Sequence, residues 1–200
     1  QGSVMNSKRH LLVSAIVCCV AGCLSFPAAA QAYPTKPIRL VVPFGAGGVA
    51  DLTARTVVQK MAEGLGQSVV IDNKPGAGGV VAGDAVAKAA PDGYTLLLMS
   101  NGTAVSAGLF KSLPFDTAKD FAPVSTLGFF DLSIVVADNS RFKTLGELLA
   151  YARANPGKLN VGTINVGSTQ NLAAELFKTS AGVDVQVVPF NGTPAVITAL

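Results

Sequence analysis

An α/β protein built on parallel sheets is the fold class that this 200-residue sequence predicts. Three observations support it. Short apolar runs alternate with segments of helical periodicity, 50% of the residues are hydrophobic, and only 14% are charged. Strands that are almost wholly apolar are typical of parallel sheets covered on both faces. The apolar content excludes a disordered polymer. A net charge of +3, without a run of Lys or Arg, excludes a general nucleic-acid binder.

The first half of the chain predicts a β-α-β-α-β unit. In the first helix apolar residues recur at a spacing of three and four, from Ala50 to Leu65, and Gly64 and Gly66 end it. The turn at Pro91-Asp92-Gly93 ends the second helix. The expected elements are strand 37–43, helix 50–65, strand 68–72, helix 80–90 and strand 94–100.

A second α/β unit starts near Asp131. It follows a polar stretch and two apolar segments, 124–130 and 132–137. Thr144 and Glu147 form a capping box that opens a helix. The expected elements are helix 144–154, strand 159–161, helix 168–179, strand 185–189 and a helix from Pro194. The sequence stops inside this last helix, so we expect an N-terminal fragment.

Residues 1–32 have the pattern of a secretory signal, preceded by four residues before Met5. A basic segment at 8–10 is followed by the apolar segment 11–24 and by small residues at Ala-x-Ala spacing. The apolar segment is shorter than the about 20 residues of a membrane-spanning helix. Cleavage after Ala32 is the favoured prediction. The alternative is a lipobox, in which Cys23 carries a lipid and becomes the mature N-terminus.

Removal of this leader takes away all three Cys and the one His. It also removes Lys8 and Arg9 from the 15 basic side chains, which leaves 13 against 12 acidic ones. The remaining chain has no disulfide, no thiol nucleophile and no His general base. A Ser-His-Asp mechanism and a zinc site of the usual Cys/His type are therefore excluded.

The most informative motif is the glycine-rich segment from Pro43 to Asp51, between a strand and a helix. Glycines there let backbone N–H groups approach a ligand, and the helix N-terminus adds partial positive charge. The segment therefore predicts an anion cradle that needs no Lys or Arg. Asp51 is interpreted as an acid that orients this loop. Phe44 adjoins the cradle.

Two further loops have similar chemistry, at 100–103 and at 167–170. All three follow strands, and parallel sheets bind ligands beyond the carboxyl ends of their strands. We therefore expect the three loops to converge. The glycines of 75–79 are equally consistent with a role in turns alone.

A dinucleotide site is the alternative interpretation of the first loop. Gly45-x-Gly47-x-x-Ala50 fits the G-x-G-x-x-G/A pattern, and Asp72 ends the next strand where a ribose-binding acid would lie. Two features disfavour it: Pro43-Phe44 separates the strand from the glycines, and a second glycine-rich loop follows Asp72 directly. An exported protein would also need its cofactor supplied outside the cytoplasm.

Four motifs resemble one family in register. They are Tyr33-Pro34-Thr35-Lys36-Pro37-Ile38-Arg39-Leu40 running into Val42-Pro43-Phe44-Gly45-Ala46-Gly47-Gly48 with Asp51 and Arg55, then Asn73-Lys74-Pro75-Gly76-Ala77-Gly78-Gly79, Pro91-Asp92-Gly93-Tyr94-Thr95-Leu96-Leu97 and Val188-Pro189-Phe190-Asn191-Gly192-Thr193-Pro194-Ala195. From residue 33 to 200 the chain is similar to substrate-binding receptors of tripartite tricarboxylate transporters, the Bug or TctC-like family.

The resemblance implies a two-lobed, type II periplasmic-binding-protein fold and a chain of roughly 300 residues. It implies lobes 33–130 and 131–200, the second incomplete, which close on a small carboxylate. The protein is expected to be a periplasmic monomer without cofactor or enzymatic activity, and to deliver its ligand to membrane permease subunits. The expected ligand-binding residues are Phe44, Gly45, Ala46, Gly47, Gly48, Asp51, Ser100, Asn101, Thr103, Gly167, Ser168, Thr169, Phe190 and Asn191.

One departure concerns the far end of the ligand. The family often has Tyr-Lys-Gly where this chain has Phe190-Asn191-Gly192, which removes a hydroxyl and a charge. The alternative functions are a secreted dinucleotide-dependent oxidoreductase that uses the Gly45 loop and a receptor that feeds signalling instead of transport. The ligand could be a di- or tricarboxylate, an amino acid or an aromatic acid.

Overall fold

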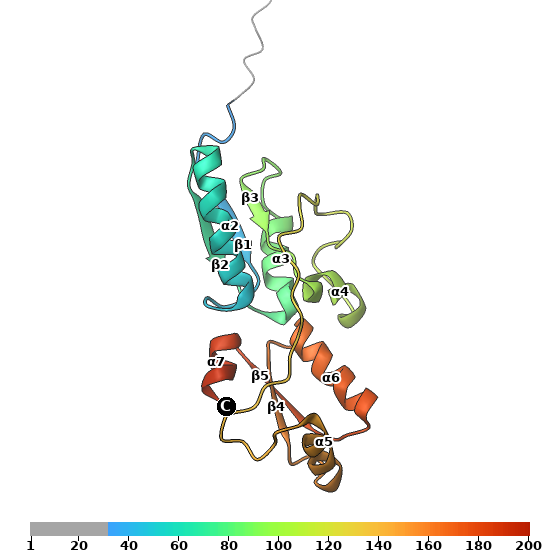
Figure 1. Ribbon diagram of the computed structural model, residues 1–200. Helices are drawn as coiled ribbons and strands as arrows, with labels where there is room; N and C mark the ends of the chain where they lie inside the picture. The colour runs from blue at the N-terminus through green and yellow to red at the C-terminus, as the bar shows by residue number, and fades with distance from the viewer. Residues whose placement is uncertain (1–31) are drawn as a thin grey trace, which may run out of the picture. The chain divides into compact units, whose positions relative to one another are not determined.

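The computed structural model describes residues 32–200, of which 34–200 form one compact unit. Two separate parallel sheets organise this unit, one of three strands and one of two, each flanked by helices (Figure 1). The predicted leader with its basic segment, its apolar segment and Cys23 lies outside the described residues. Within 32–200 no helix is both long enough and apolar enough to cross a membrane.

The first sheet has the strand order β2-β1-β3, with β1 (Ile38–Val42) in the centre. It pairs in parallel with β2 (Val69–Asn73) and with β3 (Thr95–Leu97). Four of the five β1 residues are buried, because this strand is covered on both faces. The sequence therefore predicted correctly that the three strands lie side by side in one parallel sheet.

Helices cover this sheet. The long α2 (Val49–Leu65) lies along β1 and β2, with Ala54 and Val58 in the core (Figure 1). A single turn, η1 (Ala77–Gly79), leads into α3 (Val80–Ala87), which packs against β3. The next helix, α4 (Asn101–Leu109), directly follows the third strand.

The second sheet pairs β4 (Asn160–Ile164) with β5 (Gln186–Phe190) in parallel. Its helices are α5 (Leu145–Ala154), α6 (Thr169–Ala181) and α7 (Thr193–Thr198). The predicted capping box of α5 is present, since Thr144 and Glu147 each accept a hydrogen bond from the other's backbone N–H. Ala152, Val183 and Val185 form the small hydrophobic core beside the second sheet. The boundary between residues 130 and 131 stays a prediction.

Two elements differ from the sequence-based expectation. The third strand covers three residues instead of seven, and residues 101–109, which were not expected to be helical, form α4. Ser100 caps this helix by accepting from the Thr103 backbone N–H at 3.3 Å, so an N-cap serine was the available signal. The apolar segments 124–130 and 132–137, for which no element was predicted, contain no helix or strand, and Phe129 is 94% exposed.

Candidate functional site

The 43–48 loop joins the end of β1 to the start of α2. Pro43 and Phe44 are buried, which anchors the loop, while Gly47 adopts φ +82 and starts the turn into the helix. This left-handed conformation favours glycine over other L residues. Gly48 is the N-cap, and no side chain caps α2 there. Residues 46 and 47 form a hydrogen-bonded turn, and Gly48 is buried. Within residues 32–200, the backbone N–H groups of Gly45 and Ala46 donate no hydrogen bond. They remain available to an anion.

Asp51 fixes this loop through hydrogen bonds to its carboxylate. Its carboxylate accepts hydrogen bonds from Gly47 N–H at 2.9 Å, from Arg55 Nε at 2.9 Å and from Asn73 Nδ2 at 3.0 Å. The side chain is only 2% exposed. The hydrogen bonds, that from Arg55 foremost, lower the pKa of Asp51 from 3.8 to about 2, against the opposing effect of burial. The carboxylate is therefore charged at neutral pH, and both of its oxygens already have partners.

The 165–168 loop joins β4 to α6 with closely similar geometry. Gly167 has φ +81, and its N–H donates to Asn171 Oδ1 at 3.2 Å. Ser168 is the N-cap; its hydroxyl accepts from Asn171 N–H and donates to the Ile164 carbonyl at 2.9 Å. The side chains of Asp51 and Asn171 both occupy the third helical position of their helix. Each therefore fixes a glycine N–H one residue before the cap.

Backbones from both sheets meet at two contacts. A Cβ atom on Gly45 would lie 3.0 Å from the carbonyl oxygen of Asn191, and one on Gly47 would lie 3.3 Å from Pro194 Cγ. A Cβ atom on Gly102 would lie 2.6 Å from the carbonyl oxygen of Gly167, and one on Gly78 would lie 3.0 Å from the same atom. The loops at the carboxyl ends of the two sheets thus come together, and at Gly102 the Gly167 carbonyl leaves no room for a Cβ atom.

The predicted site residues differ in their exposure. Ala46, Gly47, Asn101 and Asn191 are exposed, and Gly45, Ser100, Thr169 and Phe190 are partly buried. The buried ones are Phe44, Gly48, Asp51, Thr103, Gly167 and Ser168. Their assignment as ligand contacts stays a prediction. The buried residues support the loops in this structure, whereas Ala46 and Gly47 are exposed to solvent.

Sequence reasoning missed several residues of this region. Asn73 donates to both the Phe44 carbonyl, at 2.9 Å, and Asp51. Asn165 Oδ1 is buried in the second loop and has no hydrogen-bond partner within the described residues. Thr193 lies beside Gly48. Two signals were available: Asn73 and Thr193 stand in motifs shared with the family, and all three polar residues lie at or just beyond the carboxyl end of a strand.

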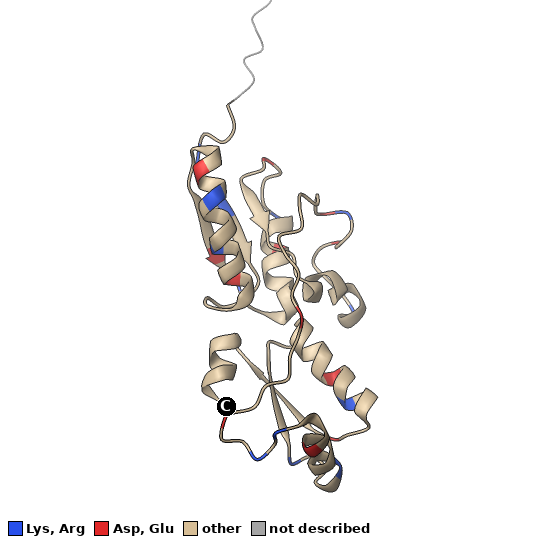
Figure 2. Ribbon diagram, in the orientation of Figure 1, with Lys and Arg blue, Asp and Glu red and all other residues tan. Residues whose placement is uncertain are grey.

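The two loops themselves contain no charged side chains. The 43–48 and 165–168 loops carry no charged residue, and neither does α7, which is tan throughout in Figure 2. Within the described residues, no cluster of three or more His, Cys, Asp or Glu is placed to hold a metal ion. Asp72, the acid of the dinucleotide interpretation, is paired with Arg39 at 3.6 Å and Lys74 at 3.4 Å.

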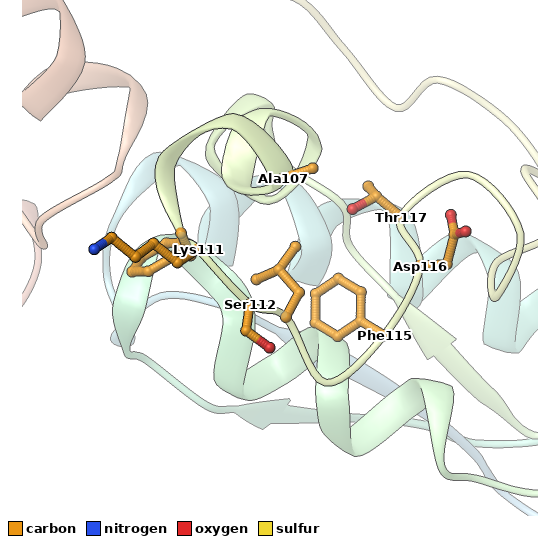
Figure 3. Close-up of a pocket in the computed structure, with 8 residues that line it drawn as sticks. Ala107, Lys111, Ser112, Phe115, Asp116 and Thr117 are labelled. Carbon is orange, nitrogen blue, oxygen red and sulfur yellow. The ribbon is translucent and has the colours of Figure 1, made fainter.

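Two surface hollows are lined by residues outside these loops. One of about 360 Å³ is lined by residues 107–117, and Figure 3 shows the Lys111 amino group pointing away from the Phe115 ring within it. Another of about 460 Å³ lies between the apolar residues 132–136 and the start of α5. The first has its one cation directed away. The second is lined mostly by apolar residues, and the amino group of its one cation, Lys143, donates to the Asp138 carbonyl at 2.7 Å.

Comparison with known proteins decides the family. The profile of the tripartite tricarboxylate transporter family receptor, TctC, matches residues 53–200. The chain belongs to this receptor family. Two Bordetella pertussis relatives are similar to it: a UPF0065 protein is 43% identical over 86% of this chain and 53% of its own length, and the protein BugT is 38% identical over 98% and 61%. The chain therefore spans between half and two thirds of the length of these two relatives.

Solved structures agree on the fold. The periplasmic binding protein BugD superposes with a TM-score of 0.73 at 31% identity, over 84% of this chain and 56% of BugD. MatC from Rhodopseudomonas palustris with bound malate gives 0.72 at 34% identity, over 84% and 57%. R. palustris Rpa4515 with adipate gives 0.70 at 34%, over 84% and 56%. This TctC chain has the α/β fold of periplasmic binding proteins, and the family consists of solute-binding receptors.

Proposed function

We propose that this TctC chain belongs to an extracytoplasmic receptor that captures a small carboxylate and delivers it to the permease subunits of a tripartite tricarboxylate-type transporter. One observation carries the proposal: uncharged glycine loops at the carboxyl ends of both sheets make close contacts, and the backbone N–H groups of Gly45 and Ala46 donate no hydrogen bond within the described residues. The malate and adipate bound by two structural neighbours support the same ligand class.

We favour a dicarboxylate as the ligand. The 43–48 and 165–168 loops each lead into a helix N-terminus, and each helix N-terminus favours one negative group. Hydrogen bonds to a charged group contribute roughly 1.5–3 kcal/mol each, so two or three of them suffice for micromolar binding. The residues between these loops then act in binding, and no catalytic role is assigned to any of them.

The test is a thermal-shift and titration-calorimetry series on the full-length natural protein. Malate and adipate are compared with their diamides, which keep the shape and lose the charge. A dicarboxylate present at 100 times its dissociation constant raises the free energy of unfolding of the protein by about 2.7 kcal/mol. Binding of an acid but not of its diamide supports the proposal. The proposal is contradicted if the protein binds neither malate nor adipate nor any other di- or tricarboxylate. Ultraviolet absorbance of a bound nucleotide would favour an oxidoreductase instead.

Export and anchoring form a separate part of the proposal. We expect cleavage after Ala32, which is exposed at the start of the described residues, and release of the receptor into the periplasm. N-terminal mass analysis of protein from a bacterial host is the test. A chain that begins at Tyr33 supports a soluble receptor, and a diacylglyceryl group on Cys23 would make it a lipid-anchored one.

A further inference from the structure

The Asp51 carboxylate creates an electrostatic problem for an anion site. It lies almost fully buried and charged beneath the 43–48 loop, one hydrogen bond away from Gly47 N–H. A negative charge so close to a set of N–H groups repels any second anion that they attract, and low-dielectric surroundings strengthen the repulsion. The loop can be an anion cradle only where that charge is cancelled nearby.

Arg55 is placed to cancel it. One helical turn after Asp51, its Nε donates to Oδ2 at 2.9 Å and its Nη2 donates to Oδ1 at 3.1 Å. This bidentate geometry is the strongest that a guanidinium offers to a carboxylate. The Arg55 side chain is 53% exposed, so it lies on the solvent side of the carboxylate, while Gly47 lies on the loop side.

Asn73 completes the arrangement from the neighbouring strand. Its amide donates to the Phe44 carbonyl at 2.9 Å and to Asp51 Oδ1 at 3.0 Å. One side chain thereby ties the start of the loop to the helix that follows it. The N–H groups between these two anchors keep their direction, which limits the reorganisation required when a ligand binds.

The 165–168 loop provides an internal comparison. Asn171 holds Gly167 N–H as Asp51 holds Gly47 N–H, yet it is uncharged. The residue one turn later is Glu175, which pairs with Lys178 at 3.7 Å and not with Asn171. A neutral brace thus has no counter-ion, and the charged brace has one. An arginine partner is therefore present where the acceptor is a charged aspartate and absent where the acceptor is a neutral asparagine.

We propose that Asp51, Arg55 and Asn73 form a charge-compensated brace that keeps the 43–48 loop receptive to a carboxylate. In this brace Asp51 and Asn73 fix the loop, and Arg55 neutralises Asp51 instead of contacting the ligand. The inference rests on the proposed function and adds three positioning residues to it. Its distinctive consequence is that Arg55 matters only while Asp51 is charged.

A double-mutant cycle tests this consequence by titration calorimetry with malate and adipate on the full-length natural protein. Arg55→Met leaves the buried charge uncompensated and weakens binding of the acid by about tenfold, equivalent to 1.4 kcal/mol. Asp51→Asn with Arg55→Met removes both charges and keeps an oxygen that can accept from Gly47 N–H. We expect the double variant to bind at least about threefold more tightly than Arg55→Met alone.

Lys60→Met is the matched control, because Lys60 is an exposed cation on the same helix that pairs with Glu63. It leaves binding unchanged. A double variant as weak as Arg55→Met would show that Arg55 contacts the ligand directly, and it would overturn the brace. So would an Arg55→Met variant that binds as the wild type does, or an equal loss in Lys60→Met.

Hydrogen exchange tests the brace without any ligand. The Gly47 amide proton is expected to exchange slowly in the wild type and at an unprotected rate in Asp51→Ala. Fast exchange of Gly47 in the wild type contradicts the brace. This measurement separates the two proposals: if the wild-type protein binds no carboxylate, the proposed function fails, while slow exchange at Gly47 still supports the part that Asp51 plays.

Discussion

The 43–48 and 165–168 loops solve the same structural problem with different chemistry. Each follows a strand, each has a glycine at φ close to +80, and each has a side chain at the third helical position that accepts from that glycine's N–H. The first uses a carboxylate with an arginine partner, and the second uses a neutral amide. The difference indicates that loop geometry requires only an acceptor oxygen, and that a charged acceptor requires compensation.

Gly47→Val is expected to have the largest effect. A Cβ atom there is strained at φ +82 and lies 3.3 Å from Pro194 Cγ, so the loop must move away from its present course. We expect malate and adipate affinity to fall by about 100-fold or more with the fold retained. Calorimetry together with circular dichroism measures both. Gly64→Ala is the control, since nothing lies within 4 Å of that position; unchanged binding in Gly47→Val would mean that the loop is not the cradle.

Gly102→Ala tests the contact between the sheets. Its Cβ atom would lie 2.6 Å from the carbonyl oxygen of Gly167, a backbone atom that cannot swing aside. We expect a loss of unfolding free energy of about 1–3 kcal/mol, or a displaced 165–168 loop. Urea denaturation gives the first and amide chemical shifts the second. Gly108→Ala, on the same helix with open space around it, serves as the control. Equal unfolding free energies and chemical shifts in the two variants would contradict the close contact between Gly102 and Gly167.

Acid stability distinguishes the charged acceptor from the neutral one. The pKa of Asp51 is lowered from 3.8 to about 2 in the folded protein, chiefly by the hydrogen bond from Arg55. Its stabilising contribution is therefore complete above pH 3.8 and is lost as the pH falls through about 2. This contribution is about 2 kcal/mol. Urea denaturation between pH 6 and pH 2 should show a shallower pH dependence in Asp51→Asn, and identical slopes would contradict the shift.

Asn171→Asp introduces the smallest change, a charge without a counter-ion in the second loop. The oxygen that accepts from Gly167 N–H is kept, so the loop should hold its shape. Because the new carboxylate repels an anion at the α6 N-terminus, we expect acid affinity to fall by about threefold to tenfold. Asn160→Asp is the matched control at the opposite end of β4. A loss that is equal in both variants would reflect total charge alone.

The sequence by itself predicted much of this protein. Apolar runs and helical spacing placed the strands of both sheets and most of their helices, because a parallel sheet with covered faces leaves a strong local pattern. The glycine-rich segment after β1 indicated a loop that brings backbone to a ligand, and four motifs together indicated the TctC family. Local signals did not predict α4. Gly102 and Gly108 lower the helical propensity of this segment, whereas Ser100 stabilises the helix as its N-cap.

Only the tertiary structure revealed what holds the loop. Asn73 lies 29 residues from Phe44 and 22 from Asp51 along the chain, and no periodicity relates them. The approach of Gly102 to Gly167 and of Gly45 to Asn191 likewise joins different sheets. Hydrogen bonds and close backbone contacts between distant segments depend on how the sheets pack, whereas helices and strands depend mainly on neighbouring residues. That is why the sequence could predict a cradle and interpret Asp51 as the acid that orients it, whereas the hydrogen bonds from Asn73 to Phe44 and Asp51 became visible only in the structure.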